Sequence, residues 1–160
     1  MTDAPVTTPD APSPRRRLFE VVTVGLPFSA FKLLGGLHLA LVPTMSVHVV
    51  GVLVALLGAV DLTLNLTNVL GLLWRGRTIG PLCLLHGVVG RRRSPALEEL
   101  GLAIDTVLAF LIVAGMIAWS RLPLLPPAWG AVWNIAVILN VLGAGALRLN
   151  DAVTRARRAD

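Results

Sequence analysis

Three ionisable residues, Lys32, Asp61 and Asp105, interrupt long apolar stretches of the 160-residue chain. A charged side chain at the middle of a bilayer costs roughly 2.5 to 3.5 kcal/mol on insertion scales, so such residues are expected to face neighbouring helices and pair there. Two chemistries fit this set: an ion or proton path through the membrane, or a buried ion pair that fixes helix packing. For a chain this short we expect the packing role.

The depth of each polar residue along its expected helix predicts which side chains meet. Lys32 and Asp61 both lie roughly 20 Å from the inner ends of their helices, and Asp105 lies about 12 Å from the inner end of its own. We therefore predict that Lys32 pairs with Asp61 in a central layer and that Asp105 belongs to a separate inner layer. The offset of roughly 8 Å between the two carboxylates argues against an intramembrane enzyme that pairs them. The predicted network comprises Lys32, Asp61 and Asn134 in the central layer, Asp105, Asn65 and Asn140 in the inner layer, and Asn68.

The spacing of polar and small residues predicts one inward face for the helix expected over residues 45–74. At about 100° per residue, its polar residues fall on the same side as Gly58. Gly51 lies near that side, and small residues there permit close approach of a second helix. The face comprises Gly58, Asp61, Asn65 and Asn68.

Two histidines, His38 and His48, flank the short turn at Pro43 and are expected at similar depth near the outer membrane surface. Two imidazoles at one level could ligate haem axially or share a metal ion. No carboxylate lies near them in the sequence, so we expect polar caps and predict no cofactor or metal, with a haem-binding membrane anchor as an alternative. The chain has no nucleophile-elbow, zinc-protease, P-loop or CxxC motif, so we do not expect an enzyme.

The composition indicates a membrane protein rather than a water-soluble domain. Apolar residues make up 55% of the chain and charged residues 14%, and the mean hydropathy is +0.77, whereas soluble domains are about 25% charged. A helix needs about 20 apolar residues to cross the hydrocarbon core. We predict an all-α bundle of four transmembrane helices over residues 18–42, 45–74, 97–119 and 128–149. The first helix is expected to bend or break near Pro27.

Basic residues define the orientation that we expect for these four spans. Twelve of the fourteen basic residues lie in a disordered tail, residues 1–17, in a loop, residues 75–96, or in the C-terminal tail, residues 150–160, together with Arg148 just before it. Because basic residues stay on the cytoplasmic side, both termini are predicted to lie in the cytoplasm. The protein is expected in the inner membrane of a bacterium. Lipid headgroups, especially anionic ones, are the expected partners of these residues, and nucleic acid is not. The tightest basic clusters are Arg15, Arg16, Arg17, Arg91, Arg92 and Arg93.

Two further patterns concern the architecture. Residues 78–90 are apolar but too short to span, and their glycines and proline predict an interfacial or re-entrant segment. Residues 58–60 and 68–71 recur as residues 130–132 and 140–143 at an offset of 72, which would make the fold two tandem helical hairpins.

These features favour a non-enzymatic integral membrane protein that acts as a subunit or scaffold of a membrane assembly. Its expected partners are further copies of itself or other membrane proteins, because small residues line the helix faces. The main alternative is a small homo-oligomeric channel or proton-coupled transporter that uses Lys32, Asp61 and Asp105.

Overall fold

The computed structural model describes residues 13–81, 83–84, 87–88, 95–118 and 125–159, and the regular elements in these ranges are all helices. Three helical segments are long and apolar enough to cross a membrane, and a shorter apolar helix covers Ala103–Ala118. The all-α prediction is therefore confirmed. The three segments are Pro14–Ala40, Met45–Arg75 and Pro127–Asn150. The elements are α1 (Pro14–Glu20), the π-helical turn η1 (Val21–Gly25), α2 (Leu26–Ala40), α3 (Met45–Arg75), α5 (Pro95–Ala118) and α6 (Pro127–Ala159).

The first three elements form one continuous helical segment that starts earlier than predicted. The Ser13 hydroxyl accepts a hydrogen bond from the Arg16 N–H, and Pro14 occupies the first turn, where its missing N–H is tolerated. Residues 14–17, predicted to belong to the disordered tail, are therefore helical. At the other end of the chain, α6 continues to Ala159, so residues 150–159 of the predicted basic tail are helical.

The helix passes Pro27 without breaking. In η1 the backbone hydrogen bonds span five residues instead of the four of an α-helix, so the turn is wider. The Leu26 N–H donates to the Val21 carbonyl five residues earlier. A proline ring crowds the preceding helical turn and donates no hydrogen bond, so a wider turn directly before Pro27 relieves both problems. A π-helical turn thus lies directly before Pro27, where the sequence predicted a bend or a break.

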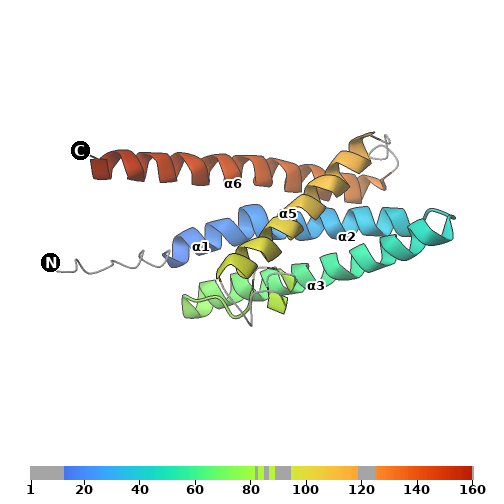
Figure 1. Cartoon of the computed structure of the whole chain (residues 1–160), viewed down its shortest axis with the longest axis horizontal. Coiled ribbons are helices and arrows are strands. Elements are labelled where there is room, and N and C mark those ends of the chain that lie inside the picture. Colours follow the sequence, from blue (N-terminus) through green and yellow to red (C-terminus); the bar gives the residue numbers. More distant parts are fainter. Residues whose placement is uncertain (1–12, 82, 85–86, 89–94, 119–124, 160) are drawn as a thin grey trace.

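Helices α2 and α3 form a tight antiparallel hairpin (Figure 1). A Cβ atom built on Gly36 would overlap the backbone of Ala55, and one on Gly58 would overlap the backbone of Leu33. Glycine at these positions lets the two backbones approach more closely than any side chain would permit. The expected inward face of α3 is buried.

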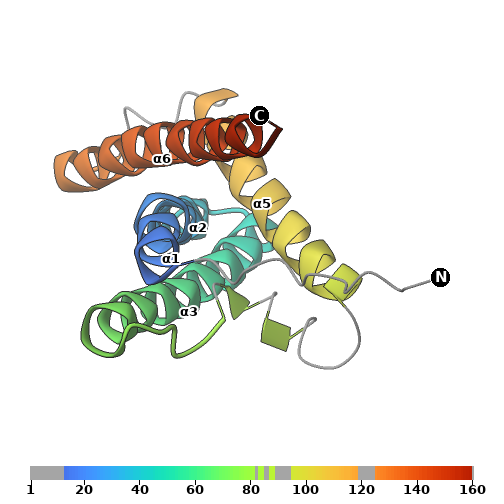
Figure 2. The ribbon, with the colours of Figure 1, turned by 90° about the vertical axis from the view of Figure 1, so that its left-hand side faces the viewer.

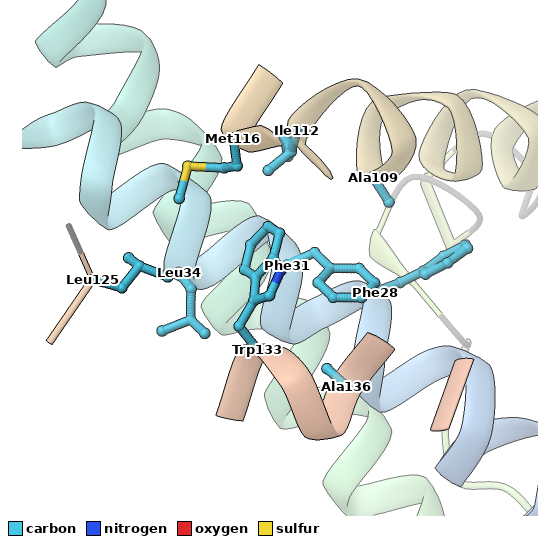
Figure 3. Close-up of a cluster of buried hydrophobic side chains, with 9 residues drawn as sticks. All are labelled: Phe28, Phe31, Leu34, Ala109, Ile112, Met116, Leu125, Trp133 and Ala136. Carbon is cyan, nitrogen blue, oxygen red and sulfur yellow. The ribbon is translucent and has the colours of Figure 1, made fainter. Parts of the chain in front are cut away.

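Helix α2 is central, because α3, α5 and α6 all pack against it (Figure 2). The apolar core lies between α2, α5 and α6 (Figure 3). Within it, the rings of Phe31 and Trp133 lie with their centroids 5.0 Å apart, and at its edge Phe28 meets the exposed Phe110 edge-on at 5.8 Å. Helix α5 crosses the α2–α3 hairpin obliquely instead of running parallel to it (Figures 1 and 2).

The two halves of the proposed repeat have different surroundings. Among the described residues, α2 and α3 pack along their length, whereas α5 and α6 pack on α2 with no comparable contact between them. Gly58 lies against the backbone of α2, whereas a Cβ atom on Gly130, its counterpart in the repeat, would meet nothing within 4 Å.

Candidate functional site

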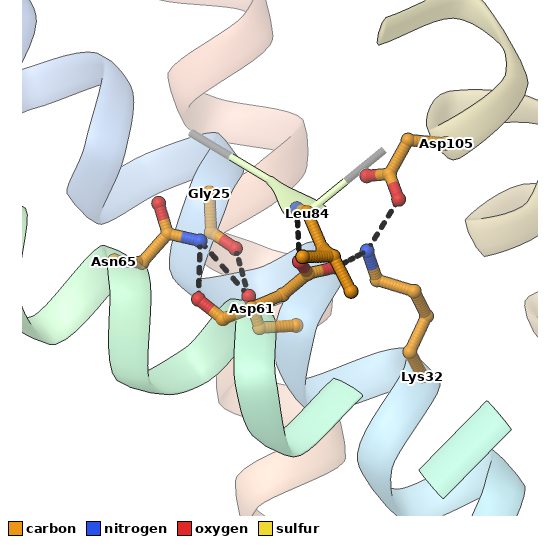
Figure 4. A network of polar contacts seen from close by, with 7 residues as sticks. Gly25, Lys32, Asp61, Asn65, Leu84 and Asp105 are labelled. Atoms are coloured by element: carbon orange, nitrogen blue, oxygen red, sulfur yellow. Dashed lines mark hydrogen bonds and ion pairs between the residues drawn. The ribbon is translucent and has the colours of Figure 1, made fainter. Parts of the chain in front are cut away.

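A cluster of three charged side chains lies where α2, α3 and α5 meet (Figure 4). The Lys32 ammonium donates to the Asp61 carboxylate and, over 2.6 Å, to Oδ1 of Asp105. Lys32 and Asp61 are completely buried, and Asp105 is 3% exposed. We call these three residues the charge cluster.

The position of Asp105 corrects the prediction of two separate polar layers. Lys32 and Asp61 meet as expected, but Asp105 reaches the same ammonium group. The depth estimate assumed straight helices and counted each depth from the helix's own inner end, but α5 begins part of the way along the α2–α3 hairpin, so Asp105 lies at the level of Lys32 (Figure 1). The argument against paired carboxylates that rested on their separate levels therefore fails.

The charge cluster brings one cation together with two acidic groups away from solvent. Removing charges from water costs several kcal/mol per ion, and this cost is offset only where the geometry is good and further hydrogen bonds are made. Asp61 makes such a bond, because its Oδ1 accepts from the backbone N–H of Leu84 over 2.6 Å. The charge cluster therefore joins three helices and one loop segment.

That loop segment turns back along α3. Helix α3 ends at Arg75 and is capped by Gly76, whose N–H donates to the Leu72 carbonyl. The φ angle of Gly76 is +64°, a left-handed conformation that glycine adopts without strain because it has no Cβ atom. Asn68 Oδ1 then accepts from the N–H groups of Ile79 and Gly80 over 3.0 and 2.9 Å, and its Nδ2 donates to the Pro81 carbonyl over 3.0 Å.

The segment predicted to be interfacial or re-entrant runs back along α3 toward the charge cluster. Asn68 holds residues 79–81, and Asp61, two helical turns away on α3, holds Leu84. The chain thus returns along α3 by about 10 Å from the level of Asn68. We call residues 77–84, as far as the structure describes them, the return segment. Leu82 and residues 85–86 and 89–90 of the predicted segment lie outside the described residues.

A second group of polar contacts adjoins the charge cluster (Figure 4). Asn65 Nδ2 donates to the Ser29 hydroxyl over 3.0 Å and to the Asp61 carbonyl over 2.9 Å. Ser29 in turn donates to the Gly25 carbonyl over 2.8 Å, and a Cβ atom on Gly25 would overlap the Asn65 side chain. Sequence reasoning missed Ser29, although it lies one helical turn before Lys32, and it had no signal for Leu84, which contributes only a backbone N–H.

The two amides predicted on α6 lie apart from the cluster. Asn134 is exposed and Asn140 is half-buried, and neither has a hydrogen bond to the charge cluster. Trp133, the residue before Asn134, faces the core, so the 100° step turns Asn134 outward. The expectation that Asn134 joins a central polar layer is therefore wrong for this chain.

The histidines lie at the far end of the hairpin. The His48 Nδ1–H donates to the Ala40 carbonyl over 2.5 Å and so satisfies one of the last carbonyls of α2. His38 is half-buried and lines an apolar cavity. Within the described ranges, no group of three or more His, Cys, Asp or Glu side chains is arranged to hold a metal ion.

The predicted basic clusters can be placed only in part. Arg15 and Arg16 are exposed on α1 and Arg17 is half-buried, at the end of the chain's first long helical segment. Arg91, Arg92 and Arg93 lie outside the described residues. Trp74 is 80% exposed at the end of α3, beside the exposed Arg75.

The described residues thus form an all-helical protein in which three helical segments are long and apolar enough to cross a membrane. No known protein family, curated protein or solved structure matches the chain.

Proposed function

We propose that this protein is a non-enzymatic integral membrane subunit or scaffold that joins a membrane assembly through α6. The charge cluster stabilises the packing of helices within the subunit, and the outer side of α6 binds a partner. The partner is another membrane helix, from a second copy of this chain or from another membrane protein.

The observation that carries the proposal is the exposed amide of Asn134 on an apolar part of α6. In the described part of the chain the Asn134 side chain makes no hydrogen bond, and its neighbours Ile135 and Ile138 are exposed. An amide without a partner is unfavourable in hydrocarbon, and a hydrogen bond to another helix removes this cost. By contrast, the exposed hydroxyl of Thr63 donates to the Ala59 carbonyl of its own helix.

Small residues flank Asn134 on the same side of α6. Gly130, Asn134, Ile138, Val141 and Gly145 fall within about 80° of one another around the helix, and we call them the α6 face. A Cβ atom on Gly130 or Gly145 would meet nothing within 4 Å. Glycines flanking an amide are typical of surfaces where a second membrane helix packs closely.

The proposed membrane arrangement has four spans with both termini in the cytoplasm of a bacterium. Helix α5 serves as the fourth span in this arrangement. Its apolar part, Ala103–Ala118, is shorter than the other three spans, and its full 24 residues measure about 36 Å against the roughly 30 Å of the hydrocarbon core. The orientation rests on the basic residues before α1, between α3 and α5, and at the end of α6.

Replacing Asn134 with Leu is expected to weaken the assembly about three- to thirtyfold. An interhelical hydrogen bond in a membrane contributes roughly 0.6 to 2 kcal/mol, and leucine keeps the bulk while removing the amide. The dissociation constant is measured in vesicles by energy transfer between labelled copies, or by co-purification with the native partner. Thr63→Val is the matched control, because it removes an exposed polar group whose hydrogen bond stays inside α3. Equal weakening by both variants would contradict a specific role for Asn134.

The channel or transporter alternative rests on the buried charges themselves. It requires that the purified protein alone carries a specific flux in vesicles, and that Asp61→Asn or Lys32→Met abolishes the flux while the protein stays folded. A flux of this kind, together with a protein that purifies without any partner and stays monomeric, would overturn the subunit proposal.

A further inference from the structure

A large apolar cavity lies between α2, α3 and α5, separate from the charge cluster. Its volume is about 450 Å³. All but one of its lining side chains are apolar or glycine, and the exception is His38.

The cavity occupies the half of the hairpin that leads away from the charge cluster. It begins at Gly35 and Leu108, each one helical turn beyond a residue of the charge cluster, and extends to Val42 and Met116. Along the helices this is a distance of about 10 to 12 Å. Val50 and Leu111 are 52% and 64% exposed, so the cavity opens sideways onto the apolar surface of the protein.

A cavity of this kind is not filled by water. Engineered apolar cavities of about 150 Å³ stay dry and bind small hydrocarbons, because water finds no hydrogen-bond partners in them. The cavity here is larger, and its walls would lose dispersion contacts if it stayed empty. On the membrane-facing side of a helical protein, hydrocarbon chains are the molecules present to fill it.

The single polar side chain of the lining is placed at the end where a lipid headgroup would lie. His38 belongs to the last turn of α2, next to the 41–44 connection, and His48 lies across that connection with its Nδ1–H on the Ala40 carbonyl. An imidazole can donate to or accept from ester and phosphate oxygens. Apolar walls with one polar group near one end are typical of sites for ligands with an apolar body.

We propose that this cavity is a binding site for one acyl chain of a glycerophospholipid, whose ester or phosphate oxygens lie at His38. The site is independent of the α6 face and of the subunit role, and it requires only that the hairpin is embedded in a bilayer.

Gly115 offers a direct way to close the site. A Cβ atom on Gly115 would meet nothing within 4 Å, although the residue lines the cavity, so a side chain there would enter the cavity without displacing the protein. Gly35, on the opposite wall, does not offer this, because its Cβ atom would overlap the side chain of Ile112.

Replacing Gly115 with Leu is expected to weaken phospholipid binding at least about tenfold. The measurement is native mass spectrometry of the purified protein titrated with dioleoyl phosphatidylglycerol, with bound lipid counted per protein. Ala114→Leu is the matched control, because it adds a similar side chain to the adjacent, exposed position that does not line the cavity. We expect the control to bind like the wild type, whereas equal binding by Gly115→Leu and the wild type would overturn the proposal.

A second measurement needs no variant. A phosphatidylglycerol with a photoreactive group in its acyl chain is expected to cross-link to peptides that contain residues 47–54 and 108–116. Cross-links spread evenly over α6 and these peptides would contradict a specific site. Purification of the protein with a stoichiometric isoprenoid, which phosphatidylglycerol fails to displace, would assign the cavity to a different lipid and so overturn the proposal.

Discussion

Replacing Lys32 with Met is expected to destabilise the folded protein by about 3 to 5 kcal/mol, because it leaves two buried carboxyl groups without their shared cation. The two groups would then face each other where neither reaches water. Stability is measured by unfolding in mixed micelles of increasing denaturing detergent, and labelling of Cys83 reports opening of the return segment.

The matched variants separate the charge from the shape of Lys32. Asp105→Asn leaves the Lys32–Asp61 pair in place, so we expect a smaller loss than with Lys32→Met. The triple variant Lys32→Met, Asp61→Asn, Asp105→Asn carries no buried charge and is expected to recover much of the lost stability, because replacing a complete buried ion cluster by neutral groups is often close to neutral. A triple variant that is less stable than Lys32→Met would contradict the claim that unpaired buried charge causes the loss of stability in Lys32→Met.

Replacing Asn68 with Leu is expected to release the return segment and raise the labelling rate of Cys83 at least about a hundredfold. The substitution removes three hydrogen bonds and leaves two N–H groups and one carbonyl without their partner. The three hydrogen bonds are partly buried, so each contributes about 1 kcal/mol, and about 3 kcal/mol of local stability corresponds to a factor of about a hundred in the open population. Cys83 is 3% exposed and is the single cysteine of the chain, so the native protein carries its own reporter.

The control for this prediction lies on the same helix. Thr67 donates its hydroxyl to the Thr63 and Leu64 carbonyls inside α3, so Thr67→Val alters a neighbouring polar residue without removing a hydrogen bond that holds the return segment. We expect Cys83 to stay protected in this variant. Slow labelling in both variants would show that other contacts hold the segment, and fast labelling in both would show that α3 itself had been disturbed.

The inward face of α3 could be predicted from the sequence because it depends only on the helical period. Gly58, Asp61, Asn65 and Asn68 are all buried, as their 100° spacing implies. The groups that this face contacts were harder to predict. The meeting of Asp61 with Lys32 follows from equal depths in two antiparallel helices, whereas the Leu84 N–H is a backbone group that leaves no mark on the sequence.

Helices outside the hairpin were harder to place. The level of Asp105 depends on where α5 lies along the hairpin, which is set by contacts with α2 and not by the residues of α5 alone. The outward direction of Asn134 depends on which side of α6 carries Trp133 into the core. Both are properties of packing between distant segments, and a count of residues along one helix does not contain them.

The distribution of the charge cluster along the chain also bears on how the protein enters the membrane. Chains are synthesised from the N-terminus, so α2 and α3 are complete before α5 exists. Lys32 and Asp61 neutralise each other within that first hairpin, which therefore needs no later segment to shield its charges. Asp105 arrives afterwards and finds its cation already in place. We therefore expect α5 to pack onto a hairpin that has already formed, so that the helices assemble in the order in which they are synthesised.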